Sequence, residues 1–159
     1  MSLRKDSYTW VWVYGSVFLI ACAIVGVILS LSRPQVTLRL GDGVFNASIA
    51  STPTTREKGL SGTKQLAESN ALLFVFKDSR PYGVWMKDMH YAIDIVWLND
   101  AKRVVHVERN VQPDSYPKTY TPKANARYII EFTAGTVDRK AIRLDSLAHF
   151  ETSNIGEVQ

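Results

Sequence analysis

Residues 84–98, VWMKDMHYAIDIVWL, constrain the fold of this chain more than any other segment. Side chains alternate between the two faces of a strand, and both halves of this segment place apolar residues on both faces. Strands of that kind are covered on both sides by other parts of the protein. Asp94 falls among these apolar positions, where a carboxylate is costly unless it is paired or hydrogen-bonded. We therefore expect a domain organised around these strands, with Asp94 buried and paired with Lys87 or, otherwise, with Arg56.

Other segments predict further strands because they alternate in the same way or are apolar on both faces. These segments are 36–40, 45–49, 71–76, 104–107 and 127–132. Thr52 followed by Pro53 predicts the start of a short helix that ends at Gly59 or Gly62, and Thr54-x-x-Glu57 offers an alternative capping box for its start. We predict an α+β class and a β-rich domain, folded as a compact, partly closed barrel or as two packed sheets with one or two short helices.

The connecting segments carry weaker signals. Gly-Asp-Gly at 41–43 suits a hairpin turn, and residues 77–83 suggest a polar turn. Residues 110–125 contain three prolines and predict a long loop, which in a small domain tends to be functional or mobile. Thr136 is expected to cap a short helix, and residues 142–150 are expected to close the sheet.

Residues 7–32 carry no charged side chain and are long enough to cross a bilayer, which takes about 20 apolar residues. Aromatic residues crowd the first end of this run, as they do at membrane interfaces, and Arg4 and Lys5 precede it. We predict three parts: a cytoplasmic stub and transmembrane anchor (1–33), a β-rich extracytoplasmic domain (34–151) and a loose tail (152–159). The chain would then contact the membrane through residues 8–32 and cross the plasma membrane once, with the soluble domain outside the cytoplasm.

Two alternatives for this segment stay open. Ser30 and Ser32 are spaced like the small residues before a signal-peptidase site, which would make the segment a cleaved signal. Residues 19–22, Leu-Ile-Ala-Cys, resemble a bacterial lipobox, in which Cys22 would carry lipid. Cys22 is the only cysteine, so the chain can form no intrachain disulfide and no cysteine-based zinc site.

Composition and motifs argue against several classes of protein. The formal net charge of +4 is modest and scattered, which argues against nucleic-acid binding. His90, His106 and His149 fall on different predicted elements without a metal-ligand spacing. The sequence contains no phosphate-binding glycine motif and no nucleophile elbow. We therefore expect no metal, no cofactor and no catalytic nucleophile.

A set of short motifs resembles one protein family. The motifs are Arg56-x-x-Gly59-Leu60, LLFVF at 72–76, Trp85-Met86-Lys87, Ile93-Asp94-Ile95, Tyr128-Ile129-Ile130-Glu131 and Ala134-Gly135. Their order and spacing resemble the Domain of Unknown Function 192 family over about residues 36–150. The resemblance implies a small β-rich fold, from a family of bacteria and archaea that is often exported or membrane-anchored and whose biochemical role is not established. The chain departs from the family pattern at Ser61, at Met89, Ala92 and Ile93, and at Leu144.

Five residues of these motifs form the candidate ligand-binding site: Arg56, Trp85, Lys87, Asp94 and Glu131. Lys87 and Asp94 are expected on neighbouring strands, with Glu131 on a third, so that a cation lies between two carboxylates beside Trp85. The same residues could instead form a buried ion-pair network that fixes strand register. We interpret the chain as a ligand-binding or accessory module of the cell envelope, with a small molecule or an envelope protein as partner. The alternative is a small hydrolase-type enzyme that uses Asp94 and Glu131 as an acid/base pair.

Overall fold

The computed structural model describes residues 13–18, 20 and 33–152. The chain divides into two units, Met1–Arg33 and Pro34–Gln159. Within the first unit, residues 13–18 are helical, and most of the predicted membrane segment 8–32 lies outside the described residues. None of the helices in the described part of the chain is both long enough and apolar enough to cross a membrane.

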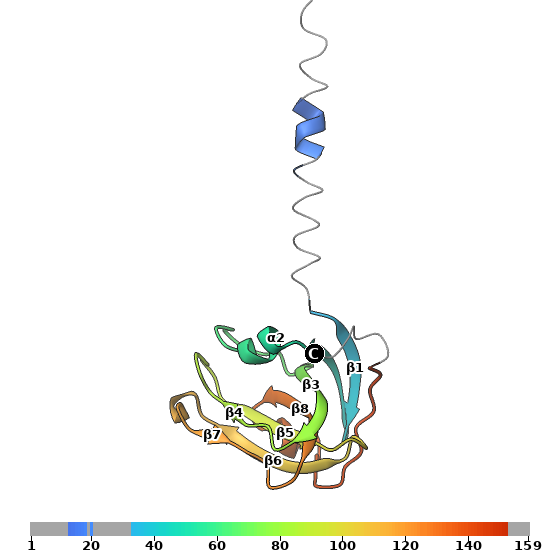
Figure 1. Cartoon of the computed structure of the whole chain (residues 1–159), viewed down its shortest axis with the longest axis vertical. Coiled ribbons are helices and arrows are strands. Elements are labelled where there is room, and N and C mark those ends of the chain that lie inside the picture. The colour runs from blue at the N-terminus through green and yellow to red at the C-terminus, as the bar shows by residue number, and fades with distance from the viewer. Residues whose placement is uncertain (1–12, 19, 21–32, 153–159) are drawn as a thin grey trace, which may run out of the picture. The chain divides into compact units, whose positions relative to one another are not determined.

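The second unit is β-rich and contains two sheets (Figure 1). The larger sheet holds, in spatial order, β1 (Gln35–Leu40), β2 (Gly43–Ala50), β3 (Asn70–Arg80), β8 (Ala126–Thr133), β5 (Ile93–Leu98) and β6 (Val104–Val111). The smaller sheet pairs β4 (Val84–Trp85) with β7 (Thr119–Tyr120), and the short helices are α2 (Pro53–Lys58), η1 (Pro113–Ser115) and α3 (Thr136–Arg139). The prediction of a β-rich fold with two sheets and short helices is confirmed.

The three middle strands β3, β8 and β5 are covered on both faces, as their sequences predict. One face carries the first core, which includes Val96 and Phe132. The opposite face carries the second core, which includes Ile95 and Trp97. Because successive side chains of a strand point to opposite faces, neighbouring residues of β5 and β8 enter different cores.

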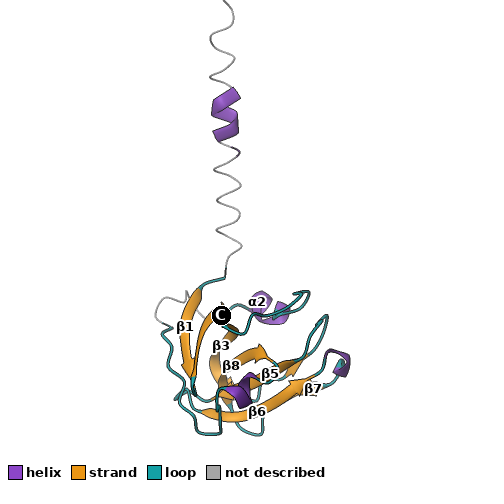
Figure 2. Cartoon of the chain, turned by 180° about the vertical axis from the view of Figure 1, so that it is seen from behind, coloured by secondary structure: helices purple, strands orange, loops and turns teal. Residues whose placement is uncertain are grey.

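The larger sheet does not close into a barrel. Its edge strands are β1 and β6, and the C-terminal segment 145–149 bonds to both edges. Arg39 of β1 exchanges two backbone hydrogen bonds with His149, each 2.9 Å long, and Val104 of β6 bonds to Asp145 and Ser146. Figure 2 shows the smaller sheet on the side of the domain away from β1. Residues 142–150 therefore join the edges by isolated bridges, not by a full strand.

Two connections differ from the sequence prediction. Strand β3 continues to Arg80, through most of the predicted turn 77–83, because Arg80 pairs with Ala126 after a register shift between Val75 and Arg80 of β3. The predicted loop 110–125 contains η1 and β7, and β7 pairs with β4. Strand β4 is therefore a short element of the smaller sheet and not a neighbour of β5, so the expectation that Lys87 and Asp94 lie on neighbouring strands is wrong.

The predicted start and end of helix α2 are confirmed. The Thr55 amide donates to the Thr52 hydroxyl, and the Thr52 amide donates to the Thr55 hydroxyl. These two reciprocal bonds form a capping box between Thr52 and Thr55. Pro53 occupies the first turn, where its missing N–H has no cost. Gly59 ends the helix with a φ of 50°, a conformation that favours glycine. This short helix carries Arg56 to the face of the sheet that holds the second core.

Candidate functional site

Asp94 is buried, as predicted, with 1% of its surface exposed, but its partners are backbone amides. The Asn110 amide donates to its Oδ1 at 2.9 Å, and the Val137 amide donates to its Oδ2 at 2.8 Å. Val137 lies in the first turn of α3, whose N-cap residue Gly135 has no side chain to satisfy that amide. Asp94 therefore caps α3 from a neighbouring strand and holds the end of β6, which is an architectural role.

The expected pairing of Asp94 with Lys87 or Arg56 is wrong. Lys87 is exposed in the turn after β4, and Arg56 donates instead to backbone carbonyls. The register of β5 against β8 also separates Asp94 from Glu131. Asp94 pairs with Phe132 and the adjacent Ile95 pairs with Glu131, so Asp94 faces the first core while Glu131 faces the second. The two carboxylates lie on opposite faces of the sheet.

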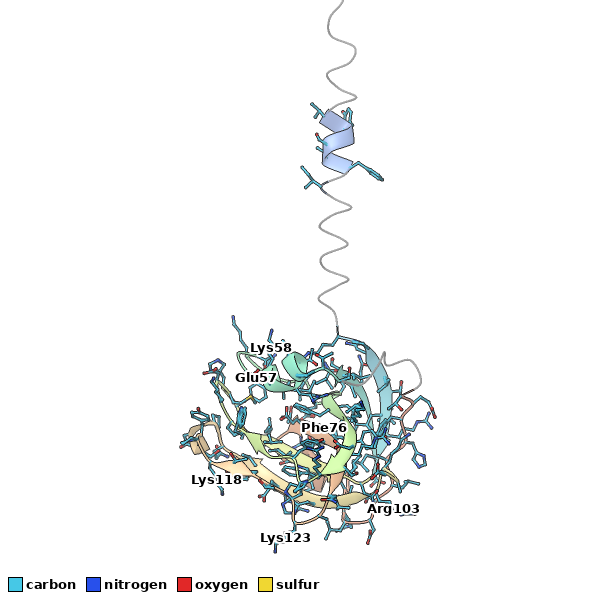
Figure 3. All side chains as sticks on the ribbon, in the orientation of Figure 1. Glu57, Lys58, Phe76, Arg103, Lys118 and Lys123 are labelled. Carbon is cyan, nitrogen blue, oxygen red and sulfur yellow. The ribbon has the colours of Figure 1, made fainter. Side chains whose placement is uncertain are left out.

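The other candidate residues line or adjoin one cavity of about 190 Å³ on the second-core face. It is bounded by α2 and the turn after it, by β3, by β4 and by β8. The residues that line it are Arg56, Glu57, Lys58, Gly59, Leu60, Ser61, Phe74, Phe76, Tyr82, Gly83, Val84, Trp85, Met89, Ile129 and Glu131. Figure 3 places Glu57 and Lys58 on α2 and Phe76 on β3, which form two of its sides. Of the five candidate residues, the fold thus brings Arg56, Trp85 and Glu131 to this cavity and leaves Asp94 out of it.

Arg56 forms part of the cavity wall from α2. Its Nη1 donates to the carbonyl oxygens of Ser51 and Val75, at 2.5 and 3.1 Å, and its guanidinium lies 5.0 Å from the centre of the Phe76 ring. Burial lowers the pKa of Arg56, an effect that nearby Tyr82 opposes. These contacts join α2 to β3, so the orientation of the cationic group is fixed by the strand beneath it.

Glu131 supplies the buried carboxylate of the cavity. It lies on β8 between Leu72 of β3 and Ile95 of β5, and only 4% of its surface is exposed. Its charge also acts on Tyr91: burial is the main cause that raises the pKa of this tyrosine, and Glu131 adds to the increase. A hydrogen bond of 2.7 Å with Thr63 opposes that increase. Glu131 thus places a carboxyl group on an otherwise apolar floor made by the central strands.

Aromatic side chains provide most of the remaining wall. Phe76 and Tyr82 stack with ring centres 3.7 Å apart and planes 11° apart, and Phe74 lies two residues before Phe76 on the same face of β3. Burial raises the pKa of Tyr82, whose hydroxyl donates to Asp78. Trp85 is 46% exposed and forms the mouth of the cavity. The arrangement offers an apolar floor that carries one carboxyl group, aromatic sides and one open aromatic face.

Lys87 adjoins this cavity without lining it. It lines a shallower hollow with Thr54 and Asp88, and that hollow shares Trp85 and Ser61 with the main cavity. The Ser61 hydroxyl donates to the Lys87 carbonyl at 2.7 Å, which ties the turn after α2 to the turn after β4. Lys87 therefore lies at the rim of the site, where it can contact only the outer part of a ligand.

Sequence reasoning missed the residues that make the aromatic wall. The sequence pattern puts Tyr82 in a polar turn and indicates for Phe74 and Phe76 only a place in a central strand. The sequence does indicate that Phe74 and Phe76 share one face of a strand. The pairing of Leu72 with Glu131, which puts that face beside the carboxylate, is visible only in the fold. As for metals, the described part of the chain holds no group of three or more His, Cys, Asp or Glu side chains that could bind an ion.

A model of the Domain of Unknown Function 192 family, described as "Uncharacterized ACR", matches residues 36–149. The chain belongs to this family. The match covers every strand of both sheets except the first residue of β1, and it contains all five candidate residues. The resemblance that the sequence motifs indicated is confirmed, and it carries with it no established activity.

Two solved structures share the fold of this Domain of Unknown Function 192 member. A Sinorhizobium meliloti 1021 protein, provisionally named a transcription regulator, is 23% identical, with a TM-score of 0.71, over 76% of this chain and 96% of that one. A protein of unknown function from Novosphingobium aromaticivorans DSM 12444 is 20% identical, with a TM-score of 0.67, over 72% of this chain and 83% of that one. No curated protein matches the chain. At these identities the likeness shows the fold alone.

Proposed function

We propose that this domain is a binding module for a small organic ligand, which occupies the cavity between α2, β3, β4 and β8. The observation that carries the proposal is the convergence of Arg56, Trp85 and Glu131, from three separate elements, on one largely apolar cavity. Ligand sites combine an apolar or aromatic lining with a few placed polar groups that set orientation. The volume of about 190 Å³ lies below the range of about 300–1,000 Å³ that holds drug-sized molecules, which favours a small ligand.

The geometry favours binding over hydrolysis by an acid/base pair. Two catalytic carboxyl groups must flank the same bond, about 5–10 Å apart, with open access for the substrate. Asp94 and Glu131 face different cores, and Asp94 is committed to two backbone amides. The hydrolase alternative therefore lacks its second carboxyl group at the cavity.

A comparison of two exposed aromatic residues tests the proposal. Trp85 lines the cavity and is 46% exposed, whereas Tyr116 is 50% exposed and does not line it. A panel of metabolites is screened against the full chain, in detergent, by ligand-observed NMR, and each compound that binds is titrated against both variants. Trp85→Ala should weaken binding about tenfold, because it removes an aromatic contact worth up to about 1.5 kcal/mol together with buried ligand area. Tyr116→Ala should leave the affinity unchanged.

The two variants also separate binding from folding. Both replaced residues are half exposed, so neither change should alter the melting temperature by more than a few degrees. A screen in which no compound loses affinity on Trp85→Ala would contradict the proposal, because the cavity would then have no role in binding.

The location of the module is a separate proposal that rests on the sequence. Residues 7–32 lack charged side chains, which supports an uncleaved single-pass anchor with the domain outside the cytoplasm, in the cell envelope. N-terminal sequencing of the protein extracted from membranes should return the start of the full chain. A mature start near Arg33, or at a lipidated Cys22, would overturn the uncleaved anchor and favour one of the two processed forms.

A further inference from the structure

We infer that the ligand is a small uncharged aromatic molecule, built on one ring or a compact fused pair, which stacks on Trp85. The inference rests on the proposed ligand cavity and names the chemical class that the cavity takes. Three observations carry it: the buried charges of the lining already interact within the chain, Trp85 presents an exposed ring, and the volume suits a small ring system.

The two charged side chains of the lining that are partly or fully buried are engaged by the protein itself. Arg56 donates to the carbonyl oxygens of Ser51 and Val75, and its guanidinium lies over the Phe76 ring. Glu131, on the floor, also interacts with other groups of the chain. A charge on the ligand would therefore gain little from either group, and it would still lose its hydration among apolar walls, which is expensive. The inner part of the cavity thus favours a ligand without a charge.

The charged side chains at the rim do not select a charged ligand either. Glu57 and Lys58 are exposed neighbours on α2 and carry opposite charges. The adjoining hollow adds Lys87 and Asp88, which are also exposed and also of opposite charge. Exposed charges are screened by water and salt, so their attraction for a ligand is weak. Because the signs balance, the rim favours neither a cation nor an anion.

Trp85 supplies the surface that selects an aromatic ligand. Phe76 and Tyr82 stack on each other, so these two rings already have a partner. Among the residues that the structure describes, none stacks on the Trp85 ring or places a cation over it. Trp85 is 46% exposed and lines the mouth of the cavity. A ring of the ligand can therefore pack on Trp85 in the offset arrangement that aromatic pairs favour.

The volume of the cavity limits the size of the ring system. An apolar cavity of about 150 Å³ holds benzene, so the present volume of about 190 Å³ holds one substituted ring or a compact fused pair. Leu60 and Ile129 add aliphatic surface to the lining. A neutral polar substituent of the ligand can remain at the open mouth, where water still reaches it.

Four compounds of similar size separate the effect of charge from the effect of the ring. Benzamide is neutral, benzoate is an anion, benzamidinium is a cation, and cyclohexanecarboxamide is neutral but not aromatic. Each is titrated into the full chain, in detergent at neutral pH, by ligand-observed NMR. Benzamide should bind about tenfold more tightly than benzoate and benzamidinium, because it has no charge to desolvate. It should bind about threefold more tightly than cyclohexanecarboxamide, because only an aromatic ring gains the stacking contact.

Two substitutions at Trp85 test the stacking contact. Trp85→Phe keeps a ring and should keep the preference for benzamide over cyclohexanecarboxamide. Trp85→Leu keeps an apolar side chain without a ring and should abolish that preference. Tyr116→Leu is the control, because Tyr116 is 50% exposed and does not line the cavity, so all four affinities should stay unchanged. If Trp85→Leu fails to fold, the ranking of the four compounds on the unaltered chain still decides the inference.

The outcomes separate this inference from the proposed function. A charged compound that equals or exceeds benzamide would overturn the uncharged ligand, and equal affinities for benzamide and cyclohexanecarboxamide would overturn the aromatic one. In both cases the ligand cavity stands if the bound compounds lose affinity on Trp85→Ala. The inference also fails, and the cavity stands, if none of the four binds while other screened compounds lose affinity on Trp85→Ala. If no compound of any kind loses affinity on Trp85→Ala, the proposed function itself fails.

Discussion

Replacing Asp94 with alanine should remove a large part of the stability of this domain. The change leaves the amides of Asn110 and Val137 without the carboxylate that accepts their hydrogen bonds. The Val137 amide is buried and costs about 1–3 kcal/mol when it loses its acceptor, while the part-buried Asn110 amide adds less, so the expected loss is roughly 2–4 kcal/mol. Domains of this size unfold with about 5–15 kcal/mol in total. Urea unfolding of the full chain, followed by circular dichroism, measures the loss.

Two controls distinguish the loss of these amide hydrogen bonds from the loss of an ion pair between Asp94 and Lys87. Asp114→Ala removes an exposed carboxylate in η1 and should change the free energy of unfolding by no more than about 0.5 kcal/mol. Lys87→Met should be equally mild, because Lys87 is exposed. The double variant Lys87→Met, Asp94→Leu should be as unstable as Asp94→Leu alone. Recovery of stability in the double variant would show that Lys87 and Asp94 do pair, against the geometry described above.

The burial of Asp94 could be predicted from the sequence, but its partners could not. Burial follows from the apolar residues around it in β5, which are local in the sequence. Its two partners are backbone amides 16 and 43 residues away, and a backbone amide has no sequence signature. A sequence indicates only side chains of opposite charge as partners for a buried carboxylate, and for Asp94 these are Lys87 and Arg56.

The sequence predicts the strands and the face on which each side chain lies wherever apolar and polar residues alternate. The faces of β5 and β8 follow the predicted pattern, with Ile130 and Phe132 in one core and Ile129 in the other. Which strands pair is a long-range property. Nothing within residues 84–98 indicates that β4 pairs with β7, more than 30 residues further along the chain. This one pairing separates Lys87 from Asp94 and opens the cavity beside Trp85.

Arg56, Trp85 and Glu131 come from separate family motifs, and the fold explains how they reach one cavity. Helix α2 lies on the second-core face, to which Glu131 points from β8, and Arg56 reaches that face by bonding to Val75 of β3. The position of Tyr82 in the wall differs from the expectation, which ends the strand at Phe76 and puts Tyr82 in a polar turn. Because β3 extends to Arg80, Tyr82 is placed over Phe76 at the edge of the cavity.

Trp97→Ala should be the second strongly destabilising change. Trp97 is fully buried in the second core, and its indole N–H donates to the Tyr82 carbonyl at 2.9 Å. Truncation of a buried tryptophan to alanine leaves a cavity and typically costs about 3–5 kcal/mol. Loss of the donor also releases Tyr82, a wall of the proposed ligand site. Urea unfolding should therefore show a large loss of stability, and affinity for any cavity ligand should fall as well.

Trp85→Ala is the matched control, since Trp85 lies only twelve residues earlier in the same sequence segment and is 46% exposed. Its removal should cost about 1 kcal/mol or less, because half of its surface already contacts solvent. Trp97→Phe adds a finer test, because phenylalanine keeps much of the buried apolar area but has no N–H donor. It should therefore lower the free energy of unfolding by less than Trp97→Ala does. Equal losses for Trp85→Ala and Trp97→Ala would contradict the placement of one tryptophan at the mouth of the cavity and the other in the core. Unequal losses in the expected order would show that Trp97 supports the folded core and that Trp85 contributes little to stability, which leaves Trp85 free to serve the cavity.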